Sequence, residues 1–172
     1  MLWAEKVFMP EKETIERARK DKRQGKSAST QAGEFVREEF HHIRQGKHGA
    51  RSPQQAIAIG LSKARRAGVK LAPPARGRSS PKVRRQAERD YQKGQQHPQR
   101  APSPRRSRIM LTILRHEGDQ SASTMAISRQ THVAAKRRTS SERSAAARKA
   151  VHAKGPARMS AAGKKAARTR RG

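Results

Sequence analysis

The fold is decided by residues 30–68, which read TQAGEFVREEFHHIRQGKHGARSPQQAIAIGLSKARRAG. Within this stretch, Ser52 supplies an N-cap, Pro53 suits the first helical position, and Gln55 completes a capping box, so a helix is predicted to start here. It should end at Gly68, because glycine accepts the left-handed conformation of a C-terminal cap. The predicted apolar face consists of Ile57, Leu61 and Ala64.

A second helix is predicted earlier in the same stretch, over residues 33–45, ending at Gly46. Its apolar stripe at helical spacing is Ala32, Val36, Phe40 and Ile43, and its polar face is Glu34, Glu38 and His41. The connection over residues 46–51 is short enough to fold the two helices back on each other as a hairpin. Ile59 falls outside the apolar face, so either a preceding helix or a second copy of the chain, as a homodimer, should cover it.

The preceding helix is predicted over residues 10–24, with Gly25 as its stop signal. Glu13 and Arg17 lie at the favourable i,i+4 spacing, and only Ile15 and Ala18 could pack against the hairpin. The predicted fold is therefore mainly α, a helical hairpin or three-helix module followed by a long disordered basic extension.

The run from Met9 to Lys70 carries distinctive segments, which are Pro10-Glu11-Lys12, Thr14-Ile15-Glu16-Arg17-Ala18-Arg19, Ser29-Thr30-Gln31-Ala32-Gly33-Glu34-Phe35-Val36-Arg37, His41-His42-Ile43-Arg44, Gly46-Lys47-His48-Gly49-Ala50-Arg51-Ser52 and Gln55 to Gly68. This run resembles a family of short, basic bacterial proteins, some of which carry the label plasmid stabilisation protein. The resemblance implies a bacterial source and an association with DNA, and it offers no catalytic residues. Because it starts at Met9, residues 1–8 are interpreted as a non-native extension.

Charge is the strongest signal in the composition. The 172 residues include 42 Lys plus Arg against 13 Asp plus Glu, a formal net charge of +29. Residues 1–68 carry +7, residues 69–119 carry +9, and residues 120–172 carry +13, with Glu142 as the only acid after Asp119. A weakly charged module followed by such a basic tail indicates a nucleic acid partner.

Residues 71–108 have the Pro, Gly, Ser, Gln and Arg content of a linker, interrupted by one short helix capped by Ser80 and Pro81. The linker holds Ser-Pro-basic elements at residues 80–85 and 103–106. They resemble elements of linker-histone tails that are associated with the DNA minor groove.

Residues 109–119 contain a short apolar run at residues 109–114. This run is predicted to be a strand or one buried helical turn. It should either dock on the hairpin or associate with another copy of the chain. Residues 120–172 form an alanine-rich basic tail that resembles the tails of bacterial histone-like proteins. Like charges repel along it, so it should stay mostly disordered until phosphates neutralise it.

The predicted nucleic-acid contacts are the clustered cations of the hairpin end, the linker and the tail: Lys63, Arg65, Arg66, Arg84, Arg85, Arg105, Arg106, Lys136, Arg137, Arg138, Arg148, Lys149, Lys164, Lys165, Arg168, Arg170 and Arg171. The chain has few aromatic residues on which bases could stack, which favours double-stranded DNA over single strands. The alternatives are an RNA- or ribosome-associated protein and a protein-interaction module in plasmid maintenance.

No enzyme signature stands out, and no catalytic residue is predicted. The pairs Glu38 with His41 and Glu39 with His42 have metal-ligand spacing, and His48 could join them, but a solvated acidic face explains them more simply. The sequence therefore predicts no metal and no cofactor. The chain has no cysteine and no apolar run long enough for a membrane span, which fits a cytoplasmic, nucleoid-associated protein.

Overall fold

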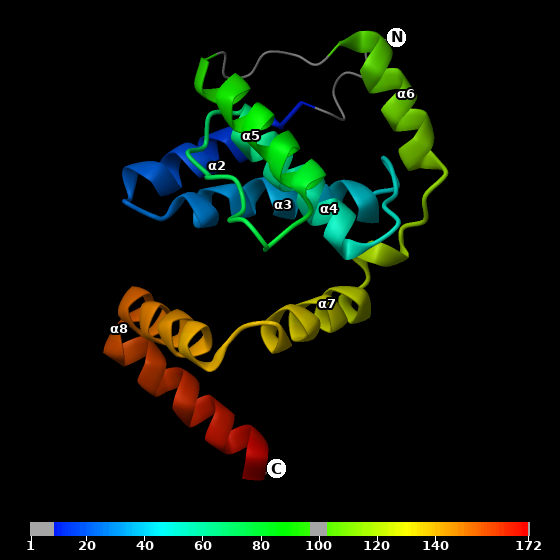
Figure 1. Cartoon of the computed structure of the whole chain (residues 1–172). Coiled ribbons are helices and arrows are strands. Elements are labelled where there is room, and N and C mark those ends of the chain that lie inside the picture. Colours follow the sequence, from blue (N-terminus) through cyan, green and yellow to red (C-terminus); the bar gives the residue numbers. More distant parts are fainter. Residues whose placement is uncertain (1–8, 97–102, 172) are drawn as a thin grey trace. The chain divides into compact units, whose positions relative to one another are not determined.

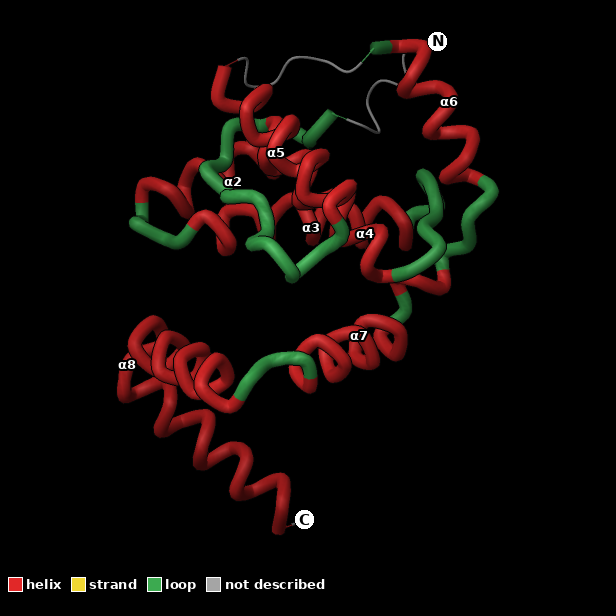
Figure 2. Tube along the Cα trace, viewed as in Figure 1, coloured by secondary structure: helices red, strands yellow, loops and turns green. Residues whose placement is uncertain are grey.

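The computed structural model describes residues 9–96 and 103–171, and these residues form helices joined by loops, with no strand among them (Figures 1 and 2). The chain is mainly helical, as the sequence predicts. It divides into two units, Met1–Ile127 and Ser128–Gly172. The extension predicted at residues 1–8 lies outside the described residues.

Helix α2 spans Lys12–Arg23 and packs against α3. Ala18 is buried at this contact, and the expected ion pair joins Arg17 to Glu13 at 3.5 Å. Gly25 follows the helix with a φ of 68°, a conformation that glycine adopts without a steric penalty. The predicted first helix and its stop are therefore confirmed.

Helices α3 (Ala28–Arg44) and α4 (Pro53–Arg66) form the predicted hairpin. The Ser52 hydroxyl accepts a hydrogen bond from the Gln55 amide at 3.3 Å, which confirms the N-cap. The Gln55 side chain in turn accepts from the Arg51 amide at 2.9 Å, one residue before its expected capping-box partner. Helix α4 is followed by Gly68 at a φ of 89°.

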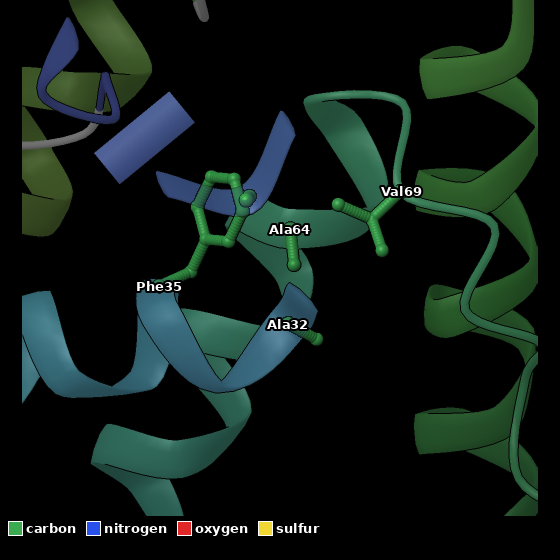
Figure 3. Close-up of a cluster of buried hydrophobic side chains, with 5 residues drawn as sticks. Ala32, Phe35, Ala64 and Val69 are labelled. Atoms are coloured by element: carbon green, nitrogen blue, oxygen red, sulfur yellow. The ribbon is translucent and has the colours of Figure 1, made fainter. Parts of the chain in front are cut away.

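One apolar cluster lies where α2, α3 and α4 meet (Figure 3). Phe35 and Ala32 of α3 lie near Ala64 of α4 and Val69, which follows that helix. A second cluster, towards the loop end of the hairpin, consists of Ile43, Ala50, Ala56 and Ala122. Between these clusters in the sequence of α3 lie the buried residues Glu38, Glu39 and His42.

The buried face of α3 is displaced from the predicted stripe. Ala32 and Ile43 are buried as expected, but Phe35 is buried more deeply than Val36 and Phe40. Helices α3 and α4 approach each other closely beside these residues, because a Cβ on Gly60 of α4 would lie 2.6 Å from the Val36 Cα atom. The glycine lets the two backbones approach each other at this point.

Helix α5 (Pro81–Gln96) is the helix predicted within the linker, and Ser80 caps it through a 3.3 Å hydrogen bond from the Val83 amide. It packs on α4. Its buried Asp90 accepts a 2.7 Å hydrogen bond from the Ser62 hydroxyl of α4. Gly94 completes the contact, since any Cβ there would overlap the backbone of Arg65.

The apolar run at residues 109–114 is helical. It belongs to α6 (Pro104–Arg115), in which Leu111 and Leu114 are buried. The loop of the hairpin meets the end of α6, where the Gly49 amide donates to the Leu114 carbonyl at 2.8 Å. The short helix η1 (Gln120–Ala122) then contacts both α3 and α4.

The remaining helices are α7 (Thr124–Lys136) and α8 (Ser140–Arg171). Helix α7 has no buried residue, and the side chains of α8 that the structure describes are almost all exposed. Within the described ranges, no helix is both long and apolar enough to cross a membrane.

Candidate functional site

Most of the predicted phosphate-binding cations lie on the surface. The exposed ones are Arg85, Arg105, Arg106, Lys136, Arg137, Arg138, Arg148, Lys149 and Arg168, and Arg66 and Arg84 are half-buried. The side chains of Lys164, Lys165, Arg170 and Arg171 are not among those that the structure describes.

Two of the predicted contacts are not on the surface. Lys63 is 5% exposed and Arg65 is 8% exposed. The Arg65 guanidinium donates a hydrogen bond to the Leu71 carbonyl at 3.2 Å. Burial lowers the pKa of Arg65, and the charge of Asp90 opposes that shift. Both side chains are therefore engaged within the module and are not available to phosphates.

The Ser-Pro-basic elements occur at the starts of helices. Pro81 and Pro104 are the first residues of α5 and α6, and Ser80 and Ser103 precede them. Proline suits this position because its missing amide hydrogen would have no helical partner. Helix initiation therefore accounts for both Ser-Pro pairs in this chain.

A second group of charged residues lies inside the hairpin. The buried polar cluster consists of Glu38, Glu39 and His42 of α3, His48 of the connecting loop and Lys63 of α4. The prediction of a solvated acidic face is wrong, since Glu38 and Glu39 are 3% and 0% exposed. Their charges can be buried because a cation from the facing helix meets them.

Lys63 is that cation. Its Nζ atom donates to Glu39 Oε1 and lies 3.6 Å from Glu38 Oε1. The other oxygen of Glu38 accepts a 3.2 Å hydrogen bond from the Glu11 amide, just before α2. The cluster thus ties α3 to α4 and to the start of α2.

The hydrogen bonds of the two histidines fix their tautomers. His42 Nε2 lies 2.9 Å from Glu11 Oε1, and His48 Nδ1 lies 3.0 Å from the Gly49 carbonyl oxygen. Because a carboxylate and a carbonyl can only accept, each of these ring nitrogens carries a proton. In the neutral rings, His42 Nδ1 and His48 Nε2 then present bare lone pairs.

The electrostatic surroundings favour a neutral His42. Burial lowers the pKa of its imidazole, although the hydrogen bond to Glu11 opposes the shift. The same hydrogen bond lowers the pKa of Glu11, which therefore stays ionised. Lys47 reinforces this arrangement at 3.2 Å from Glu11 Oε1.

The two bare nitrogens face Glu39. His48 Nε2 is 3.6 Å from Glu39 Oε2, and His42 Nδ1 is 3.8 Å from Glu39 Oε1. One donor atom from each of these three residues lies within 4.8 Å of the other two. The spacing of Glu39 and His42 on one helix is visible in the sequence, but the position of His48 depends on the path of the loop.

Comparisons of the chain with protein-family models, with curated proteins and with solved structures found no match. Two features of the chain carry chemistry from which a function can be inferred, the exposed cations and the buried polar cluster.

Proposed function

We propose that this chain binds double-stranded DNA without sequence specificity, in the nucleoid or on plasmids, by neutralising phosphates. The observation that carries the proposal is the surplus of exposed cations between residues 120 and 172, where the sequence contains a single acid, Glu142. The exposed cations that we assign to phosphate contact there are Lys136, Arg137, Arg138, Arg148, Lys149 and Arg168.

Folding does not account for these charges. Glu142 is used locally, since its carboxylate accepts a 2.9 Å hydrogen bond from the Thr139 amide at the start of α8. A row of cations that greatly outnumbers its acids is stabilised when phosphates approach and counterions are released. Such contacts hold the backbone of DNA and do not read its bases.

The aromatic residues support duplex binding. Phe35 is buried, and Phe40 and Tyr91 are half-buried. Single-strand binders stack bases on exposed aromatic rings, and the described residues present no fully exposed ring of this kind. DNA should also stabilise helix α8, because a like-charged alanine-rich segment is a marginal helix until its charge is neutralised.

The proposal is tested by measuring the affinity of the full chain for duplex DNA at several salt concentrations. If about 6 to 10 phosphates are engaged, log K should fall with log salt at a slope of about −5 to −9. A variant with glutamine at five tail positions should bind more weakly and reduce the slope by about 4 to 5. The substituted residues are Lys136, Arg137, Arg138, Arg148 and Lys149.

The matched control removes the same charge from α2. It carries glutamine at Lys12, Arg19, Lys20, Lys22 and Arg23, which are all exposed. This variant should keep the wild-type slope. Equal losses in both variants would show that only net charge matters, and unchanged binding in the tail variant would refute the assignment of the tail.

Two alternative functions can be distinguished from DNA binding by further measurements on the same protein. Tighter binding of structured RNA than of duplex DNA in direct competition would favour an RNA- or ribosome-associated protein.

A protein-interaction role in plasmid maintenance would use three exposed apolar side chains of α6. These are Ile109, Met110 and Ile113, which are 54%, 40% and 49% exposed. Alanine at these positions should leave DNA affinity unchanged under our proposal.

A further inference from the structure

The buried polar cluster contains an excess of hydrogen-bond acceptors. Glu39 Oε2, His42 Nδ1 and His48 Nε2 are buried, and none of them has a hydrogen-bond partner among the described residues. Their side chains are 0%, 2% and 1% exposed. Buried acceptors that face each other without a donor between them are costly, so the arrangement favours a cation at their centre.

We propose that Glu39, His42 and His48 bind one Zn²⁺ ion inside the helical hairpin. Two imidazole nitrogens and one carboxylate oxygen form a donor set that zinc uses, whereas Mg²⁺ and Ca²⁺ prefer oxygen ligands alone. Zinc bonds of about 2.0–2.2 Å place tetrahedral ligand atoms about 3.4 Å apart. The present separation of 3.6 Å between His48 Nε2 and Glu39 Oε2 is close to this value, and the three ligand atoms, which lie within 4.8 Å of one another, need to approach by at most about 1.4 Å.

The surrounding residues orient the three ligands. Histidines that bind zinc usually donate their second ring proton to a carboxylate or a backbone carbonyl, which fixes the tautomer and increases the basicity of the ligand nitrogen. His42 does so to Glu11, and His48 does so to the Gly49 carbonyl. Lys63 holds Glu39 through Oε1, which leaves Oε2 directed at His48.

The local charge also suits a divalent ion. Glu11, Glu38 and Glu39 bring three carboxylates to the cluster, and Lys47 and Lys63 bring two ammonium groups. A dication bound by neutral imidazoles turns this excess of one negative charge into an excess of one positive charge. Because the three ligands join α3 to the hairpin loop, the bound ion would act as a structural crosslink.

The test is a titration of Zn²⁺ into the full chain after treatment with a chelator, in competition with a chromophoric zinc indicator. We expect one site per chain and a higher melting temperature in the zinc-loaded protein, since the ion binds the folded state. An excess of Mg²⁺ should not compete. Absence of a stoichiometric site would overturn the proposal.

The variants are His48→Gln and, as the matched control, His41→Gln. His41 precedes His42 on the same helix and is exposed, so its removal should leave the zinc affinity unchanged. His48→Gln should weaken binding about 100-fold or more, because changes even in residues that only support a ligand cost 10- to 100-fold. Equal affinity in the two variants would refute the site.

A measurement on the wild-type chain covers the case in which His48→Gln does not fold. NMR of the histidine ring nitrogens should show Zn²⁺ shifting His42 Nδ1 and His48 Nε2 while His41 stays unchanged. If His48 instead donates a proton to Glu39 as an ion pair, both of its ring nitrogens will be protonated and will not respond to zinc.

Discussion

At the scale of single residues, Lys63 has the most unexpected environment. Its position near the end of α4, beside Arg65 and Arg66, predicts a phosphate-binding cation, yet its side chain is buried against Glu38 and Glu39. Removing one partner of a buried ion pair leaves an uncompensated charge in a medium that solvates it poorly. Lys63 therefore stabilises the hairpin.

The variant Lys63→Met should lower the free energy of unfolding by about 3–5 kcal/mol, because it leaves two buried carboxylates with fewer cations. Urea denaturation in the presence of a chelator measures the loss without a contribution from bound metal. The control is Lys20→Met on the exposed side of α2, which should change stability by less than about 0.5 kcal/mol. If both variants lost similarly small amounts of unfolding free energy, Lys63 would contribute little to the stability of the hairpin.

At the scale of elements, the close approach of α3 and α4 depends on Gly60. A Cβ added there would meet the Val36 Cα atom at 2.6 Å and the Phe35 carbonyl oxygen at 3.0 Å, and neither backbone atom can move independently of the helix. The helices would have to separate, which would also open the apolar cluster around Phe35.

Gly60→Ala should therefore destabilise the module by about 1–3 kcal/mol, the usual cost of overpacking, despite the better helix propensity of alanine. Gly33→Ala is the matched control. Gly33 lies in α3 with nothing within 4 Å of an added Cβ, so this change should stabilise by about 0.5–1 kcal/mol. Thermal denaturation followed by circular dichroism measures the change in stability of both variants. Changes of the same sign would contradict the packing argument.

The elements were largely predictable, but the way they face each other was not. Ser52, Gly68 and the Ser80-Pro81 pair act on the backbone within a few residues, so they predict where α4 and α5 begin or end. The inner face of α3 is different, because hydrophobicity predicts that Glu38 and Glu39 face water. Only the arrival of Lys63 from another helix reverses that prediction. The approach of His48 to His42 depends instead on the path of the loop.

At the scale of the whole molecule, the chain divides into a helical unit that ends at Ile127 and an acid-poor tail. The helical unit extends beyond α6, since Ala122 of η1 is 2% exposed and its carbonyl accepts a 3.0 Å hydrogen bond from Arg44. Residues 128–172, beyond the boundary at Ile127, carry +13 of the net charge of +29, and they contain a single acid.

Deletion of residues 128–172 should leave the melting temperature within about 2 °C of the full chain, measured at a salt concentration that screens long-range repulsion. Deletion of residues 120–172 removes eight more residues, including buried Ala122, and should lower the melting temperature by at least about 4 °C. Identical midpoints for the two deletions would show that η1 does not support the module.

The hydrogen bonds from the hairpin loop to the end of α6 have a consequence for biosynthesis. Gly49 and Ala50 pair with Leu114 and Gly118, which are translated more than sixty residues later. On the ribosome, α2, α3 and α4 are synthesised before these partners, while the later residues are still being added at roughly 5–20 residues per second. A nascent chain therefore holds an incomplete hairpin for several seconds, with Ile43 and Ala50 uncovered until Ala122 arrives.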